Sequence, residues 1–320
     1  MRKIFIFVLL VSLNLISQKG PDYVSEPSVP TISPPVKELP PSEQEKNPYA
    51  LEMKRRDDWG FSGENKQGSP WNNPLLDIQS NAPAPNLLEQ KAFSTPIINV
   101  NGYTSPSSPP DTTGDVGRNH FLQATNAGGY GSLVHIYTKN GTFVQTFAME
   151  GLASSSPCND GYCDPIVMYD YFADRWVITE FPATGSYFCV YVSTTSNPQG
   201  TWYAYTFGSL GYGGPPDYPK YGIWPLDEDG DGQYLEGSYL IGVNAGSTGK
   251  RDLYALDRKK MLQGQPATYQ KFSVNTLSAF GFQLVLPAGH EGPYPPTSNS
   301  GAFFLRPVDT EIHSGFTCSP

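Results

Sequence analysis

The sequence predicts an all-β domain built from repeated units of strands. From about residue 97 the chain of 320 residues contains many short runs of β-branched and aromatic residues, nearly all separated by Gly, Asn, Asp or Pro. This punctuation is typical of sandwiches, barrels and propellers. An aspartate beside a proline recurs at a fixed interval, and only residues 256–264 (LDRKKMLQG) have a helical pattern. We therefore expect strands throughout the domain, with one short helix.

The amino terminus predicts export from the cell. Arg2 and Lys3 precede an apolar run over residues 4–16, which is too short to span a bilayer comfortably but fits the core of a signal peptide. We expect a signal peptide over residues 1–19, a secreted or cell-surface protein, and no further transmembrane helix. The sequence after the run lacks an Ala-x-Ala cleavage pattern, so an uncleaved anchor is the alternative.

Residues 20–95 predict a spacer rather than part of the core. Prolines crowd its first half (PDYVSEPSVPTISPPVKELPPSEQEKNP), which offers few large apolar side chains for burial. Segments of this composition stay extended. We expect a disordered proline-rich spacer and then a poorly ordered linker, whose aromatic residues Trp59, Phe61 and Trp71 pack on the domain that follows.

A sequence repeat predicts the architecture of residues 96–320. Asp111, Asp164 and Asp217 are separated by two intervals of 53 residues, and each opens a group of expected strands. A fourth opening is expected near residue 287. Periods of about 40 to 50 residues with four strands in each unit are typical of propeller blades. We therefore predict a β-propeller with three to four blades in this chain.

Two short motifs predict turns between these strands. Asn140-Gly141 predicts a type I′ hairpin, because both central residues of that turn need positive φ. The stretch NPQGTW, from Asn197 to Trp202, is a degenerate match to the Asp-box turn of sialidase-like propellers, with Asn in place of Asp. Such turns are structural and imply no glycosidase activity.

Several longer phrases resemble a known family. PPDTTGDVGRNHFLQATN, DPIVMYDYFADRWVITEF, DYPKYGIWP and LYALDRKKMLQGQPATYQKF are similar to blade openings of secreted, mostly bacterial β-propellers that are uncharacterised or sialidase-like. The resemblance covers about residues 105–311. It implies a propeller fold and an extracellular location, but no catalytic residue. Family members would continue through further strands, so we expect a truncated product or differently paired blades, with self-association through open strand edges.

An acidic stretch in the third unit predicts a calcium site. In LDEDGDGQYLEG the aspartates alternate and a glycine follows, as at positions 1, 3, 5 and 6 of an EF-hand loop. Position 12 is Ser238 instead of the usual glutamate. The alternative is a solvated acidic hairpin tip. The predicted ligands are Asp227, Asp229, Asp231, Gln233 and Glu236.

The recurrent acids allow two interpretations. In a propeller, Asp111, Asp164 and Asp217 would occupy equivalent places near one mouth of the central channel, where a ring of acids could bind a cation or a sugar. The favoured alternative is structural, because each has a proline neighbour and could accept backbone hydrogen bonds in its own turn.

The cysteines predict one small disulfide loop. Cys158 and Cys163 flank the turn-like tetrapeptide NDGY, and in an exported chain such a pair can form a disulfide. A zinc site is the weaker alternative, because a zinc knuckle is tighter and needs a second pair. Cys189 lies in an expected strand and is predicted to be a buried thiol.

Charge and motifs narrow the function classes. A formal charge of −9 argues against nucleic-acid and anionic-membrane partners, which call for a basic face. The chain contains no Gly-x-Ser-x-Gly, His-Glu-x-x-His or phosphate-loop motif, and His135 has the setting of a packed strand residue. We predict a binding or scaffold module for an extracellular carbohydrate or protein ligand. The alternative is a sialidase-like glycan hydrolase, for which Arg175, Arg251 and Arg306 provide one arginine in each unit from the second onward.

Overall fold

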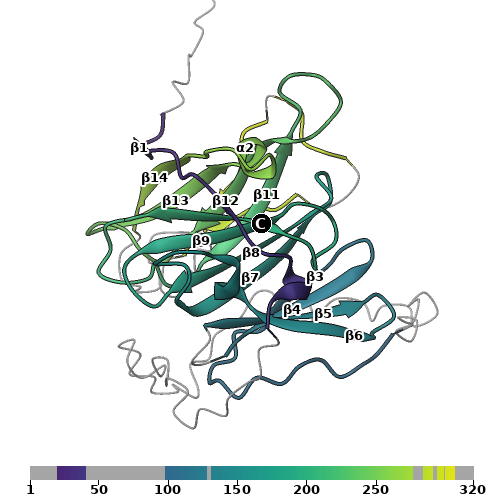
Figure 1. Cartoon of the computed structure of the whole chain (residues 1–320). Coiled ribbons are helices and arrows are strands. Elements are labelled where there is room, and N and C mark those ends of the chain that lie inside the picture. The colour runs from purple at the N-terminus through teal and green to yellow at the C-terminus, as the bar shows by residue number, and fades with distance from the viewer. Residues whose placement is uncertain are drawn as a thin grey trace, which may run out of the picture.

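The computed structural model describes residues 20–40, 98–127, 131–276, 284–290, 294–298 and 300–306, and these form an all-β fold (Figure 1). The predicted signal peptide over 1–19 and the aromatic residues Trp59, Phe61 and Trp71 lie outside the described residues. In the described part, no helix has the length and apolar character needed to cross a membrane.

Three antiparallel sheets follow one another along the chain and are consistent with propeller blades. Blade one contains β3 (Thr113–Val116), β4 (His120–Asn126), β5 (Ser132–Thr138) and β6 (Phe143–Ala148). Blade two contains β7 (Gly161–Asp170), β8 (Arg175–Pro182), β9 (Tyr187–Ser193) and β10 (Trp202–Gly208). Blade three contains β11 (Lys220–Leu226), β12 (Glu236–Gly242), β13 (Lys250–Asp257) and β14 (Tyr269–Asn275). Each of the three recurrent aspartates therefore lies at the start of a group of four consecutive strands, as the 53-residue repeat predicts.

The remaining elements are short, and most lie against a single blade or connect its strands. Helix α2 (Arg258–Leu262) lies where the one helical pattern predicts it, and the 3-10 turns η1 (Val36–Glu38) and η3 (Met149–Leu152) are single turns. Near the expected fourth opening, β15 (Leu286–Pro287) pairs with β16 (Phe304–Leu305), and β15 lies against β11 and β12 of blade three. In the described residues, the region of the expected fourth opening therefore contains a two-stranded sheet, and the fourth blade stays a prediction.

Two apolar cores hold the blades together, and strand alternation divides the side chains between them. On β9, Cys189 and Tyr191 face the core shared with blade one, whereas Phe188 and Val190 face the core shared with blade three. Successive strand residues point to opposite sides of a sheet. Blade two is therefore buried on both faces.

The predicted Cys158–Cys163 disulfide is wrong, and the same alternation explains why. Cys158 is bonded to Cys189 instead, with 5.6 Å between their Cα atoms. Both residues belong to the core between blades one and two, whereas Cys163 is a buried free thiol in the core between blades two and three. The sheet thus separates the sulfur of Cys163 from that of Cys158, although only a short turn separates them in sequence.

The expectation of a spacer from residue 20 is also wrong for residues 20–40, which we call the strap. Its strand β1 (Tyr23–Val24) pairs with β14, and its strand β2 (Thr31–Ile32) pairs with β10. The fully buried Val36 then enters the core between blades one and two, and its carbonyl accepts a hydrogen bond of 2.7 Å from Gln145 Nε2 on β6. The purple segment in Figure 1 therefore crosses all three blades and covers the outer edges of two of them.

A buried ion pair joins blades two and three. Asp170, at the end of β7, accepts hydrogen bonds from Arg258 Nε at 2.6 Å and Nη2 at 2.8 Å, and neither side chain has any exposed surface. Tyr239 donates a third hydrogen bond of 2.9 Å to the same carboxylate. Asp170 Oδ1 also accepts a hydrogen bond of 3.2 Å from Ala173 N in the turn after β7. Asp170 therefore stabilises its own turn and the contact between the two blades.

The turn predictions hold in part. Strands β5 and β6 form the predicted hairpin, but only Gly141 has positive φ (83°), so the turn is not type I′ and the ladder has a register irregularity at Ile136 and Tyr137. In the NPQGTW turn, Trp202 is fully buried and donates from Nε1 to the carbonyl of Pro198 at 3.1 Å. The tryptophan therefore anchors the turn between β9 and β10.

Candidate functional site

The recurrent aspartates act on one another across the three blades. Asp111 precedes β3, Asp164 lies at an irregularity of β7, and Asp217 precedes β11. The first strands of neighbouring blades lie side by side, β3 against β7 and β7 against β11. Burial, followed by the charges of Asp111 and Asp217, raises the pKa of Asp164 to about 7. We call these three residues the inner acid cluster.

Asn126, at the end of β4, ties two members of the cluster together. Its Nδ2 donates to Asp111 Oδ2 at 2.7 Å and to the carbonyl of Pro109 at 3.1 Å. Its Oδ1 accepts from the backbone N–H of Asp164 at 3.0 Å. Because Asn126 is buried, its amide sets the position of the two acids with respect to each other.

The carboxylate of Asp164 reaches across blades, which differs from the favoured interpretation of this residue as a local turn acid. Asp164 Oδ2 accepts a hydrogen bond of 3.3 Å from the backbone N–H of Tyr218, which belongs to the opening of blade three. The backbone is left-handed at Asp111 (φ 40°), Asp164 (φ 56°) and Tyr218 (φ 55°). Non-glycine residues adopt this conformation at a cost, and such strain is concentrated at functional sites.

One cation lies among these acids. Lys220, the first residue of β11, has its Nζ 3.5 Å from the ring centroid of Tyr218 and donates to the carbonyl of Pro219 at 3.1 Å. Burial lowers the pKa of Lys220, and the three acids of the cluster oppose that effect. The site thus combines acids, one amine and an exposed aromatic ring, a set that can hydrogen-bond hydroxyl groups and exchange protons near neutral pH.

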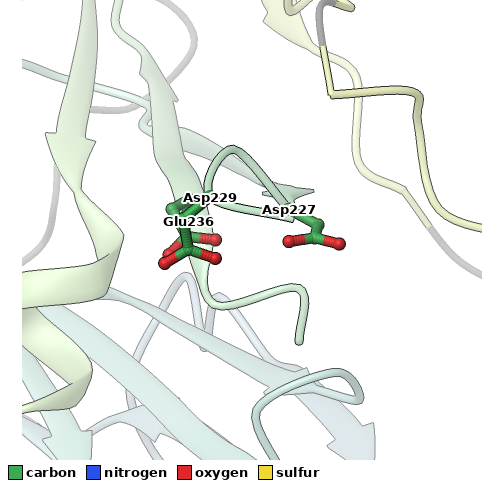
Figure 2. Close-up of side chains that lie close together, drawn as sticks. All are labelled: Asp227, Asp229 and Glu236. Carbon is green, nitrogen blue, oxygen red and sulfur yellow. The ribbon is translucent and has the colours of Figure 1, made fainter. Parts of the chain in front are cut away.

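The five predicted calcium ligands separate into two groups. The ligand oxygens of Asp227, Asp229 and Glu236 all lie within 4.8 Å of one another, and Figure 2 shows these side chains at the loop between β11 and β12. Asp231 and Gln233 instead bond to each other, with Gln233 N donating to Asp231 Oδ1 at 2.7 Å. The three converging carboxylates could hold a metal ion.

A lysine that the sequence interpretation omits already approaches these carboxylates. Lys259 Nζ donates to Asp229 Oδ2 at 2.8 Å and to Glu236 Oε1. The hydrogen bond from Lys259 is the main cause of the lowered pKa of Asp229. Arg258 Nη1 holds the base of the loop through the carbonyls of Tyr234 at 2.6 Å and Glu236 at 2.8 Å. The loop is therefore anchored by α2, the element that follows β13.

The candidate catalytic side chains outside the acids do not assemble. His135 is buried, stacks on Tyr103 and bonds to Thr146, and burial lowers its pKa to about 4, so it is a packed residue as expected. Arg175 bonds to carbonyls in the β7–β8 hairpin, at the end of β7 opposite to Asp164. Arg251 and Arg306 influence each other near the start of β13. Among the described residues, therefore, the three arginines do not form one site.

A buried glutamate is a further residue that the sequence does not single out. Glu180 in β8 is 2% exposed, and its Oε2 accepts a hydrogen bond of 3.1 Å from Ser132 N of blade one. Burial, followed by the nearby Glu150, raises the pKa of Glu180 well above its usual value. Its only sequence signal is a charge in the middle of an apolar strand, RWVITEFP.

Comparisons with known proteins do not assign the chain to a family. No family model matches it, and no curated protein does. Among solved structures, a GH43 endo-arabinanase from Bacillus licheniformis matches with 14% sequence identity and a TM-score of 0.36. The match covers 57% of this chain and 62% of that structure, so the chain spans less than two thirds of its length. The fold class therefore rests on the sheets described above, and the predicted family stays a prediction.

Proposed function

We propose that this protein is an extracellular binding module that holds a neutral, hydroxyl-rich glycan at the inner acid cluster. The observation that carries the proposal is the electrostatic coupling of Asp111, Asp164 and Asp217, which come from the openings of three different blades. Carboxylates accept hydrogen bonds from sugar hydroxyls, and a protonated Asp164 can also donate one. The disulfide supports an extracellular location, because such bonds persist in oxidising compartments.

The charge of the site favours neutral over anionic sugars. The three acids act on Lys220, the one lysine placed among them in the described residues, and the whole chain carries a formal charge of −9. An anionic sugar such as a sialic acid would meet repulsion there, and the arginines that could offset it lie apart. Neutral polysaccharides are therefore the class of ligand to test first.

The test is a binding screen against polysaccharides with matched variants. Wild type, Asp164→Asn and a control, Asp231→Asn, are titrated with cellulose, xylan, chitin and arabinan fragments and with sialyllactose. We expect binding to a neutral fragment that falls at least tenfold in Asp164→Asn and is unchanged in Asp231→Asn, an exposed loop acid. Equal affinity in the two variants, or preference for sialyllactose, would overturn the proposal.

Glycan hydrolysis is the second candidate, and the raised pKa of Asp164 favours it. A carboxyl that titrates near pH 7 beside two further acids is the arrangement in which one acid donates a proton and a second acts as base or nucleophile. The measurement is release of reducing ends from the bound polysaccharide as a function of pH. We expect Asp164→Asn to abolish turnover; wild-type binding without turnover across pH 4 to 9 would leave only the binding function.

For the acidic loop, we propose calcium binding in competition with Lys259. The ammonium group supplies positive charge to Asp229 and Glu236, so a bound calcium ion would have to displace it. Calorimetric titration should therefore show tighter calcium binding in Lys259→Gln than in wild type, and none in Asp229→Ala. If Lys259→Gln gives no heat and no calcium-dependent rise in Tm, the loop is an acidic turn only.

A further inference from the structure

A cavity of about 610 Å³ lies on the face of blade one that is turned away from blade two. Leu122, Ala124 and Val134 enter the core with blade two. The alternate positions, among them Phe121 and Tyr137, therefore point to the opposite side of the sheet and line the cavity. Its volume is within the range of about 300 to 1,000 Å³ that is usual for small-molecule sites.

Residues 98–103 form the roof of the cavity and are fixed to the sheet at both ends. Tyr103 N donates to Gln123 Oε1 at 2.9 Å, Gln123 Nε2 donates to the Tyr103 carbonyl at 3.0 Å, and the Tyr103 ring stacks on His135 at 3.7 Å. At the other end Val100 lies so close to Gly141 that a Cβ there would be 2.7 Å from its Cγ1. The cavity between these two attachments is thus bounded by residues 98–103 on one side and by the sheet of blade one on the other.

The lining has the composition of a sugar subsite. Phe121 and Tyr137 provide aromatic surface, and Ile98 and Val100 provide aliphatic surface above them. The polar residues that join them are Asn99, Thr112, Thr113, Gln123, Thr138 and Lys139. Binding sites are commonly apolar surfaces with a few placed polar groups. A sugar ring matches this set, because it has an apolar C–H face and hydroxyl groups around its edge.

The cavity is continuous in sequence with the inner acid cluster. Thr112 and Thr113 line it and directly follow Asp111. Solvent reaches it, since Val100 is 53% exposed and Val116 is 39% exposed. We propose that the cavity is an extended subsite that holds the sugar units next to the unit bound at the acid cluster, so that the ligand is an oligosaccharide chain rather than a single terminal sugar. This inference rests on the proposed function.

The test fills the cavity and leaves the acids intact. Val116→Trp places an indole in the cavity from an exposed strand position, and Val29→Trp, at a 72% exposed position of the strap, is the matched control. Phe121→Ala is a second variant that removes aromatic surface without adding bulk. The probes are the glucose, xylose, N-acetylglucosamine and arabinose monosaccharides and their linear hexasaccharides, measured by calorimetry, with circular dichroism to verify folding.

We expect Val116→Trp and Phe121→Ala to weaken hexasaccharide binding at least tenfold and to leave monosaccharide binding unchanged, whereas Asp164→Asn weakens both. Equal hexasaccharide affinity in Val116→Trp and Val29→Trp would overturn the subsite while the acid cluster stands. If Val116→Trp lost hexasaccharide binding while Asp164→Asn bound the hexasaccharide as wild type does, the result would support the cavity as a sugar site and refute the acid cluster. A wild type that binds none of these sugars would overturn both.

Discussion

Replacement of Glu180 with glutamine should remove a pH dependence from the stability of the fold. The Glu180 carboxyl lies between blades one and two, where the Ser132 N–H is its backbone donor. The charge of Glu150 in η3 adds to burial in raising the pKa of Glu180. Glu180 lies near Tyr191 of β9, and its charge is the second cause, after burial, of the raised pKa of Tyr191. Folding therefore favours the protonated carboxyl.

The size of the effect follows from proton linkage. In the unfolded chain a glutamate ionises with a pKa of about 4.3, whereas in the folded state the pKa of Glu180 is well above its usual value. Between these two pKa values the folded state binds more protons. The free energy of unfolding therefore falls by about 1.4 kcal/mol for each pH unit of increase. The stabilising contribution is complete below the unfolded-state pKa and is lost as pH rises toward the folded-state pKa.

Urea denaturation of wild type and Glu180→Gln at pH 4, 5, 6, 7 and 8 measures this slope. We expect similar stabilities at pH 4, because glutamine can accept the same Ser132 hydrogen bond. From pH 5 upward, the free energy of unfolding of the variant should rise relative to that of wild type by about 1.4 kcal/mol per pH unit, as long as the folded wild-type carboxyl keeps its proton. Glu38→Gln, at an exposed strap position, controls for the change in net charge. Parallel pH profiles for wild type and Glu180→Gln would refute the reasoning.

Three further predictions test the fold. Deletion of residues 20–40 should lower Tm by about 5 °C or more in a calorimetric scan, because the buried Val36 side chain alone is worth about 1.5 to 3 kcal/mol; an unchanged Tm would contradict the strap. Asp170→Ala should cost about 3 to 5 kcal/mol in urea denaturation by leaving Arg258 buried and unpaired, and Arg258→Met in the same chain should restore part of it; simple additivity would argue against the ion pair. Loss of the Cys158 disulfide by Cys158→Ser should cost about 3 to 4 kcal/mol for a loop of 31 residues, and peptide mapping of wild type should recover Cys163 as a free thiol.

The strand pattern and the repeat were enough to predict the blades. Alternating apolar residues specify which positions can be buried, and Asp111, Asp164 and Asp217 mark equivalent places because the unit length is constant. The coupling of these acids in the fold follows from that equivalence. The hydrogen bonds through Asn126 could not be anticipated, because Asn126 joins Asp111 and Asp164 only after β4 is paired with β3 and packed beside β7.

The wrong predictions share a physical origin. The pairing of Cys158 depends on which face of blade two each sulfur occupies, and a sequence does not say which blade covers which face. The strap has little apolar surface, and composition therefore predicts disorder. Its β1 and β2 are held by backbone hydrogen bonds to open strand edges, and every residue except proline can supply both partners of such bonds. Which strand edges remain open for pairing can be determined only from the assembled blades.

The strap also imposes an order on assembly. Tyr23 pairs with Lys271 of β14, so one of the first described segments of the chain completes a sheet whose last strand is synthesised near the end of the described residues. Contacts between such distant segments form late, since a long loop must close before they contribute. A nascent chain that stops before β14 leaves β1 without its partner. Closure of the strap thus requires that β14 has been synthesised, and the exposed Tyr23 and Val24 are positions from which a spectroscopic label could report that event.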